Sequence, residues 1–115
     1  AMLIRRRDTK EFDFDGLKIT DYTANITGSS SFATITVPPG VSHAVSWSKR
    51  SDKYYFVVKG KIFFMVDGEE FTLDDGDFCI VKKGQKFRYR NDSDGDVKMV
   101  LVHTPSFAIE YEVFE

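Results

Sequence analysis

The sequence predicts an all-β fold, an antiparallel sandwich or barrel. Short apolar runs of strand length recur along the chain, glycine turns separate them at regular spacing, and no window has a sustained helical period. Eleven Phe and five Tyr stand among many Val, Ile and Thr, residue types that favour strands. With 115 residues, 42% of them hydrophobic, the chain is long enough for one packed domain and too short for two.

The pattern of the N-terminal part predicts two strands followed by a sharp corner. Residues 17–22 and 32–37 alternate between apolar and other side chains, and a small polar loop, 25–31, lies between them. Pro38-Pro39-Gly40 ends the second run, because proline has no backbone donor and fixes its own φ.

Seven further runs follow the corner, each short enough for a strand of a small barrel. They are 43–47, 54–58, 62–66, 71–73, 78–81, 87–90 and 97–102. We divide the single domain, 1–115, into N-terminal strands with an arm (2–31), the barrel (32–105) and a C-terminal tail (106–115). The tail is predicted to form either an extra strand or a short helical turn.

Two runs, 54–58 and 62–66, are apolar on both faces of the predicted strand. A small sheet cannot cover both of its own faces. Either a second sheet covers the outer face or a second copy of the chain does, and we expect a homodimer.

A frame of fixed spacing runs from residue 76 to residue 91. Gly76, Gly84 and Asn91 fit the pattern G-x5-P-x-G-x2-H-x3-N. Lys82 stands in place of its proline and Phe87 in place of its histidine.

A second frame precedes it. Gly40 and Gly60 have the spacing of the terminal glycines in G-x5-H-x-H-x3-4-E-x6-G, while Ser46, Ser48 and Lys53 stand in place of the two histidines and the glutamate. Both patterns are motifs of the cupin family, which the chain resembles over about residues 33–105. The resemblance implies an RmlC-like cupin barrel, a double-stranded β-helix or jelly roll of two sheets with a pocket between them.

In cupins, the histidines and the glutamate of these motifs hold a metal ion. Serine hydroxyls are weak ligands, a phenyl ring is none, and an ammonium group repels a cation. We therefore predict no metal and no cofactor at Ser46, Ser48, Lys53 and Phe87.

The substituted positions instead indicate a polar and aromatic pocket for a small sugar-like or anionic ligand. Lys53 would neutralise charge, the serines would donate hydrogen bonds, and aromatic rings would stack. The alternatives are a surface Lys53, a Phe87 that only fills the core, and inert serines. The predicted ligand-binding residues are Ser46, Ser48, Lys53, Tyr55, Phe87, Tyr89 and His103.

His103 is the predicted acid or base of the pocket. It shares a strand face with Val97, Met99 and Leu101, and Lys98 on the other face suggests that the first face looks inward. Metal-free cupin epimerases use histidine and tyrosine, so the catalytic candidates are His103 with Tyr55 or Tyr89. The alternative is a strand-end histidine hydrogen-bonded to backbone.

The run around Trp47 is ambiguous by one residue. The family motif turns Ser46 and Ser48 inward, whereas hydrophobic alternation would bury Val45, Trp47 and His43. We adopt the family register and expect Trp47 to be covered by another chain or by the tail.

Charge and cysteine content exclude several classes of protein. Sixteen basic and eighteen acidic residues give a formal charge of -2, so no global field draws the chain to nucleic acid or to an anionic membrane. No run approaches the roughly 18 apolar residues of a membrane span, and there is no N-terminal leader pattern. Cys79 is the only cysteine, and we expect a cytoplasmic protein.

Three functions remain open at the level of sequence. The first is a metal-free cupin that binds a small polar or anionic ligand, in a regulatory or accessory role. The second is a metal-independent isomerase, epimerase or lyase acting on a sugar or small acid through His103 and a tyrosine. The third is a structural dimerisation module.

Overall fold

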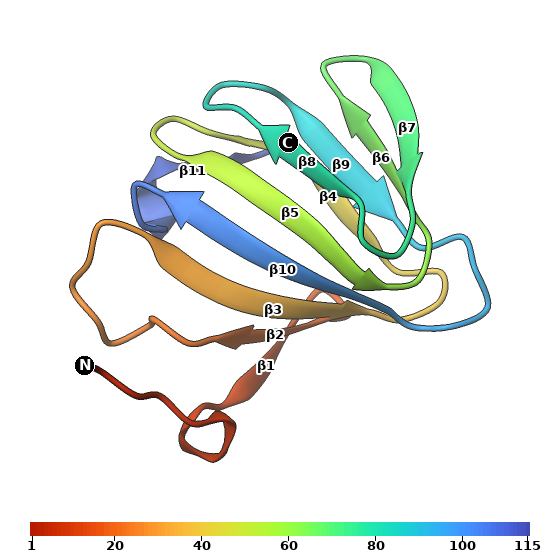
Figure 1. Cartoon of the computed structure of the whole chain (residues 1–115). Coiled ribbons are helices and arrows are strands. Elements are labelled where there is room, and N and C mark those ends of the chain that lie inside the picture. The colour runs from red at the N-terminus through yellow and green to blue at the C-terminus, as the bar shows by residue number, and fades with distance from the viewer.

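The computed structural model describes residues 1–115 and consists of two antiparallel sheets packed face to face (Figure 1). The six-stranded sheet has the order β1-β2-β3-β10-β5-β8, and the five-stranded sheet has the order β11-β4-β9-β6-β7. From β3 onward the chain crosses between the sheets at nearly every step, as in a jelly roll, which confirms the predicted fold class. The strands are β1 (Glu11–Phe14), β2 (Leu17–Asp21), β3 (Ser31–Val37), β4 (Ser42–Ser48), β5 (Asp52–Lys59), β6 (Ile62–Val66), β7 (Glu69–Leu73), β8 (Phe78–Val81), β9 (Phe87–Arg90), β10 (Val97–Thr104) and β11 (Glu112–Phe114).

Each predicted run coincides with a strand, and the differences lie at strand ends. The two ends of the chain, outside these runs, also contain regular elements. Residues 3–15 contribute a 3-10 turn, η1 (Arg6–Asp8), and strand β1. The tail forms both of its predicted alternatives, the turn η2 (Ile109–Tyr111) and then strand β11. These two 3-10 turns are the only helical elements, and no helix has the length and apolarity needed to cross a membrane.

The two doubly apolar runs are β5 and β6, and they lie in opposite sheets. Each turns one face into the space between the sheets, where Val57, Ile62 and Phe64 are fully buried. Burying an aliphatic or aromatic side chain of this size contributes about 1.5–3 kcal/mol. The other face of β5 stays exposed, with Phe56 at 41% and Val58 at 48%.

The glycine and asparagine frames form the corners of the barrel. Asn91 is fully buried, and its side-chain amide donates to the carbonyls of Val37 (2.9 Å) and Gly95 (2.7 Å). Gly40 donates to the Asn91 carbonyl at 2.8 Å, so the two frames are joined directly. At Gly60 the φ angle is +109° and a Cβ atom would lie 2.9 Å from Val97, so only glycine fits there without displacing the neighbouring strand.

Strand β4 contains a β-bulge that resolves the ambiguity around Trp47. His43 pairs with Tyr89 and Ser46 pairs with Phe87. Between these two pairs β4 advances by three residues and β9 by two, so β4 contains one extra residue. The extra residue reverses the side-chain parity within one strand. His43 and Ser46 consequently both turn inward. The family register, which turns Ser46 and Ser48 inward, therefore holds only for the residues after the bulge.

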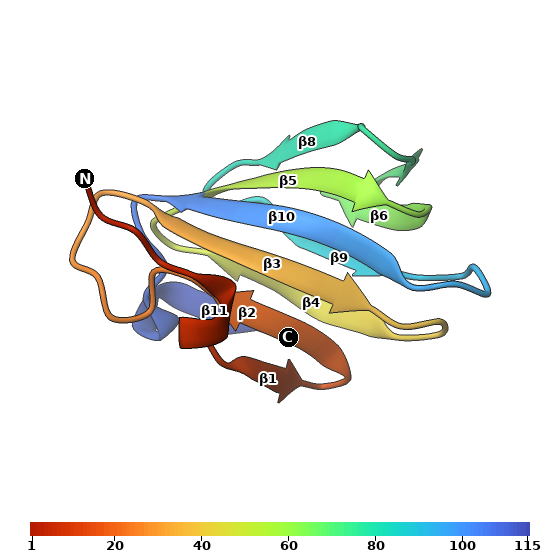
Figure 2. The ribbon, with the colours of Figure 1, turned by 60° about the horizontal axis from the view of Figure 1, so that its bottom comes forward.

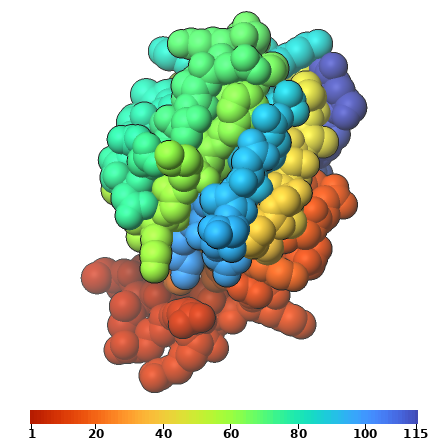
Figure 3. Space-filling view, turned by 90° about the vertical axis from the view of Figure 1, so that its right-hand side faces the viewer, coloured from red at the N-terminus to blue at the C-terminus, as the bar shows by residue number.

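The two ends of the chain meet at the open edge of the sandwich. Strand β11 pairs with β4, with Val113 opposite the half-buried Trp47. The ring of Phe114 lies 5.8 Å from that of Phe14 on β1, so the N-terminal hairpin and the tail lie side by side (Figure 2). Residues before this hairpin project beyond the barrel, as Figure 3 shows at the red end of the colour scale.

Candidate active site

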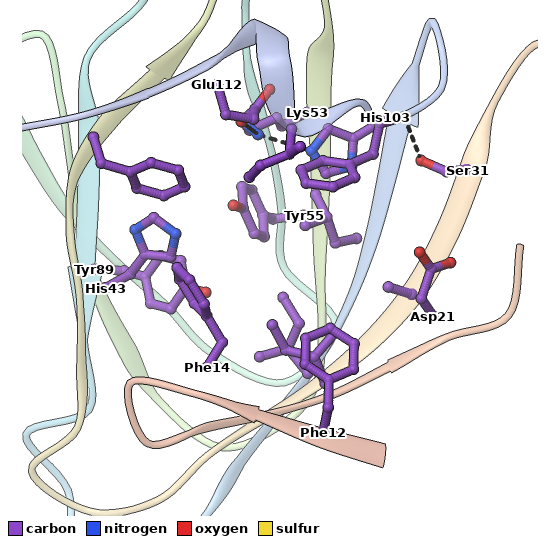
Figure 4. A pocket seen from close by; sticks show the side chains of 17 residues that line it. Phe12, Phe14, Asp21, Ser31, His43, Lys53, Tyr55, Tyr89, His103 and Glu112 are labelled. Carbon is purple, nitrogen blue, oxygen red and sulfur yellow. Dashed lines mark hydrogen bonds and ion pairs between the residues drawn. The ribbon is translucent and has the colours of Figure 1, made fainter. Parts of the chain in front are cut away.

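One end of the space between the sheets is hollow. The cavity has a volume of about 330 Å³ and its wall comes from both sheets, the N-terminal hairpin and the tail (Figure 4). This volume lies at the lower end of the range for small-molecule sites. The lining residues are mostly apolar or aromatic, with a few polar groups: Asp21, Ser31, His43, Lys53, Tyr55, Tyr89, His103 and Glu112.

His43, Tyr55 and Tyr89 form one group of polar side chains, the histidine–tyrosine cluster. The His43 ring lies 5.1 Å from the Tyr89 ring, and the two tyrosine rings are 5.7 Å apart. Figure 4 shows both tyrosine hydroxyls directed into the space beside His43. The Tyr89 hydroxyl is buried and has no hydrogen-bond partner in the protein.

A backbone contact determines the tautomer of His43. Its Nδ1 atom lies 2.7 Å from the carbonyl oxygen of Ala44. A carbonyl can only accept, so Nδ1 carries the proton and Nε2 keeps its lone pair. Burial lowers the pKa of His43 below its ordinary value of 6.5, although the bond with Ala44 acts in the opposite direction. Near neutral pH this ring is therefore an unprotonated base.

The tyrosines are protonated partners for that base. Burial raises the pKa of Tyr55 well above its ordinary value of 10.0, and it also raises the pKa of Tyr89. Both hydroxyls therefore remain neutral and can donate a hydrogen bond to a bound ligand.

Lys53, His103 and Glu112 form a second group, the lysine cluster. Lys53 Nζ donates to Glu112 Oε1 at 2.5 Å and to His103 Nε2 at 2.7 Å. The Lys53 and Glu112 side chains are 5% and 4% exposed, so this is a buried ion pair. Lys53 is thus on the cavity wall rather than at the surface, but Glu112 already balances its charge. An anionic ligand would not find a free positive charge here.

His103 is on the predicted inward face but does not have the chemistry predicted for it. Burial, and next the charge of Lys53, lower the pKa of His103 to about 3. Its Nε2 lone pair accepts a hydrogen bond from Lys53. A general base needs a free lone pair and a pKa near the working pH. His103 meets neither condition, whereas the Nε2 lone pair of His43 is free.

Three predicted ligand-binding residues are absent from the cavity wall. The Ser48 hydroxyl accepts hydrogen bonds from the backbone N–H groups of Arg50 and Ser51, which fixes the β4–β5 turn. Ser46 is buried at 1% exposure, beyond the bulge. Phe87 is buried beneath the His43 ring at 5.1 Å and below Lys53, whose Nζ is 5.6 Å from its centroid. It fills the core, the alternative given for it above.

The four positions where the family motifs place metal ligands do not suit a metal ion. Ser46, Ser48, Lys53 and Phe87 provide two hydroxyls, an ion-paired ammonium group and a phenyl ring. Elsewhere, no three His, Cys, Asp or Glu side chains lie close enough together to hold one.

Sequence reasoning missed Glu112 and most of the aromatic wall. Glu112 is the one acidic residue of β11 and reaches the cavity only because β11 pairs with β4, which no local pattern indicates. The rings of Phe12, Phe14, Phe107 and Phe114 come from the hairpin and the tail, which lie outside the family motifs. His43 had a signal in the hydrophobic alternation of its strand.

Solved structures similar to this chain share its fold. Pac13 of Streptomyces, described as a unique nucleoside dehydratase, has a TM-score of 0.87 at 22% identity, over 100% of this chain and 91% of that chain. KdgF from Halomonas sp. has a TM-score of 0.83 at 14% identity, over 96% and 98%. A predicted oxalate decarboxylase of Thermotoga maritima has a TM-score of 0.80 at 17% identity, over 90% and 99%.

Identities this low establish the fold alone, and no curated protein matches the sequence. The sequence itself matches the cupin domain family over residues 33–103, more than half of its length. The matched segment runs from β3 to β10 and contains both glycine frames. The chain therefore belongs to the cupin domain family.

Proposed function

We propose that this cupin binds a small, neutral, sugar-containing compound and removes water from it without a metal ion. The observation that carries the proposal is the tautomer of His43. Its Nδ1–H group is held by the Ala44 carbonyl at 2.7 Å, which leaves Nε2 as a free base beside two protonated tyrosines. His43 thus takes the role that sequence reasoning gave to His103.

The reaction would be an elimination next to a carbonyl group. His43 Nε2 takes a proton from the carbon adjacent to the carbonyl, and the electron pair of that C–H bond forms a C=C bond. The hydroxyl on the next carbon then leaves as water with the proton that the His43 imidazolium gives back, which restores the base. A tyrosine hydroxyl donates to the carbonyl oxygen, where negative charge develops. The substrate loses one water molecule, and no electrons are gained or lost.

The similar structures make nucleosides the first compounds to test. Pac13 is described as a nucleoside dehydratase, and three solved variants of it, each altered at a histidine or a tyrosine, are described with uridine. This cupin also has one free histidine and two tyrosines around a cavity of about 330 Å³. Such a volume suits a compound of nucleoside size.

The proposal is tested on sugars and nucleosides that carry an aldehyde or keto group and a hydroxyl on the carbon β to it. Mass spectrometry detects the loss of water, and NMR in D₂O detects exchange of the proton next to the carbonyl. We expect the wild type to catalyse one or both, and His43→Gln to do neither. Turnover that persists in His43→Gln would exclude His43 as the base. If the wild type binds members of the panel and converts none, the protein is the ligand-binding cupin of the first sequence hypothesis.

We also propose that the protein is a cytoplasmic homodimer. On the outer face of the six-stranded sheet, Phe56, Phe78 and Ile80 are 41–52% exposed on the paired strands β5 and β8. Neighbouring exposed apolar side chains are typical of an interface. Light scattering should give twice the chain mass, and Phe56→Asp with Phe78→Asp should give a monomer. A monomeric wild type would remove this proposal.

A further inference from the structure

We infer that Asp21 binds two neighbouring hydroxyls of a sugar, so that the cavity selects ligands whose sugar keeps both of them. This inference rests on the proposed sugar-containing substrate and assigns the residue that recognises its hydroxyls. Asp21 lines the cavity from the six-stranded sheet, and the proposed reaction gives it no role.

The Asp21 side chain is held at the cavity wall by its neighbours. It is the last residue of β2 and shares the inward face of that strand with Leu17 and Ile19, which belong to the core. Its Oδ1 atom accepts from the backbone N–H of Thr23 at 2.9 Å and from the Thr23 hydroxyl at 3.0 Å. The Thr23 hydroxyl oxygen accepts in turn from the N–H of Phe32 at 3.0 Å. The carboxylate is therefore oriented before a ligand arrives.

The second carboxylate oxygen, Oδ2, is free and accessible. Both hydrogen bonds of the side chain use Oδ1, and none of the five ion pairs of the protein includes Asp21. The buried side-chain atoms without a partner belong to Arg50, Tyr89 and Glu112, so Oδ2 is not among them and keeps accessible surface. Capping the turn requires only Oδ1, which leaves Oδ2 for a ligand.

Hydrogen-bond donors lie next to this acceptor. Ser31 on β3 pairs with His103 on β10, and it stands two residues from Ala33, the register partner of Asp21. Inward side chains at such positions are about 5–8 Å apart. The Ser31 oxygen accepts from the N–H of Phe107 at 3.0 Å, so its hydroxyl hydrogen is free to donate, and His103 carries its proton on Nδ1 because Nε2 accepts from the lysine cluster. Figure 4 shows the three polar side chains on one side of the cavity.

Sugar hydroxyls match this set because a hydroxyl both donates and accepts. A carboxylate oxygen has two lone pairs, so Asp21 Oδ2 can accept from two hydroxyls on adjacent carbons. The oxygens of these hydroxyls can accept from Ser31 and His103. The reacting part of the sugar then faces His43, which lies on β4 in the opposite sheet.

The charges of the wall disfavour the other ligand classes. Lys53 is balanced by Glu112 in a buried ion pair, whereas Asp21 has no cation, so the wall has one carboxylate in excess. This excess repels a carboxylate or a phosphate. A ligand ammonium group could pair with Asp21, but it would face the donors of Ser31 and His103 without an acceptor to offer them.

The first test changes the ligand and leaves the protein intact. Isothermal titration calorimetry of the wild type compares adenosine, guanosine, cytidine and uridine with the 2′-deoxy and 3′-deoxy analogues of each, so that the base is constant within a comparison. Losing a hydrogen bond to a charged acceptor costs about 1.4 kcal/mol or more, so the ribonucleoside should bind at least about tenfold more tightly than either analogue. Equal affinity within each comparison, or no binding of any ribonucleoside, would overturn the inference.

The second test removes the acceptor. In Asp21→Asn, the amide oxygen keeps both bonds with Thr23, so the NH₂ group takes the place of Oδ2 and cannot accept. The preference for the ribonucleoside over its deoxy analogues should fall to near one. Circular dichroism verifies the fold. A folded variant with an unchanged preference would show that Asp21 does not contact the sugar.

Asp52→Asn is the matched control for this variant. Asp52 is half-buried like Asp21 and also accepts from a backbone N–H through Oδ1, that of Lys83 at 2.8 Å, but it is not on the cavity wall. The preference for ribonucleosides should stay unchanged in it. An equal loss in both variants would contradict a specific role of Asp21.

An amino analogue tests the competing partner of the carboxylate. If 3′-amino-3′-deoxyadenosine binds more tightly than adenosine, and Asp21→Asn removes the difference, the wall accepts a cation and the inference is wrong. We expect the amino analogue to bind no more tightly than adenosine.

These outcomes separate this inference from the proposed reaction, because calorimetry measures binding alone. Selective binding of ribonucleosides without dehydration of any compound in the panel supports the hydroxyl site and contradicts the reaction. Dehydration by a wild type that does not distinguish ribonucleosides from their deoxy analogues supports the reaction and contradicts the hydroxyl site.

Discussion

The cavity contains two histidines, and their surroundings give them opposite chemistry. His43 bonds a neutral carbonyl through Nδ1, so its Nε2 lone pair is free. His103 bonds an ammonium group through Nε2, so its lone pair is used and its pKa falls to about 3. Both rings lie on the wall of one cavity, with His103 buried and His43 half-buried. Burial and position therefore do not identify a catalytic histidine, whereas the partner of each ring nitrogen does.

The same comparison holds for the charges around each ring. In the histidine–tyrosine cluster, no cation and no carboxylate bonds the imidazole, and the tyrosines are neutral. In the lysine cluster, a full ion pair lies against the ring. The first arrangement allows a proton to move to and from the ring, and the second fixes three groups in place.

The largest expected effect separates the two histidines by kinetics. Removing a general acid–base group costs about 10²–10⁴ in rate, so His43→Gln should lose that much in kcat on a substrate that the wild type dehydrates. His103→Gln should keep most of kcat, because the Nε2 lone pair of His103 is bonded to Lys53 and takes no proton from a substrate. Steady-state kinetics of both variants provides the measurement. If kcat collapsed in His103→Gln and survived in His43→Gln, the two roles would be reversed.

The lysine cluster should matter most for stability. Lys53→Met leaves Glu112 as an unpaired buried charge, which costs about 3–5 kcal/mol. Urea denaturation measures the loss of unfolding free energy. Lys18→Met is the matched control, since it removes an ion pair with Asp13 (2.8 Å) whose side chains are 43% and 53% exposed, and little change is expected there. Equal loss in both variants would show that the Lys53–Glu112 pair is not specially stabilising.

The pH dependence of stability should follow from both histidines. Their folded pKa values are lower than 6.5, so the unfolded chain binds more protons as the pH falls below that value. Stability is therefore complete above pH 6.5 and decreases toward acid, by up to about 1.4 kcal/mol per pH unit for each histidine. As the pH falls from 6.5 to about 5, the slope for His103→Gln should become smaller than that of the wild type, by a difference that approaches one proton. An unchanged slope would mean that His103 titrates normally in the folded protein.

The smallest expected effect concerns the hydroxyl of Tyr89. This group is buried without a partner, so Tyr89→Phe removes an unpaired polar atom. The unfolding free energy should rise by about 1 kcal/mol, while turnover should fall because the ligand loses a donor. Thermal and urea denaturation measure the first change, and kinetics the second. A destabilised Tyr89→Phe would indicate a structural role for the hydroxyl.

The barrel could be predicted from sequence because its signals are local. Glycines at corners such as Gly60 and the apolar runs of the strands determine where each strand begins and ends. The cavity was harder to predict, because its chemistry depends on contacts between residues that are distant in sequence. Lys53 lies on the cavity wall, but its partner Glu112 lies 59 residues away in the tail, whose pairing with β4 no local pattern predicted. Likewise, only the backbone reveals the bulge that turns His43 inward.

The bulge in β4 gives this barrel an unusual dependence on chain length. One added residue in β4 separates the segment with His43, the proposed base, from the segment with Ser46 and Ser48, which makes only core and turn contacts. Losing a single codon between His43 and Ser46 would exchange the two sides of the strand before the bulge and move the imidazole to the outside, while the motif serines kept their places. In cupins of this kind, a gain or loss of chemistry could thus arise from an insertion or deletion that leaves every other residue unchanged.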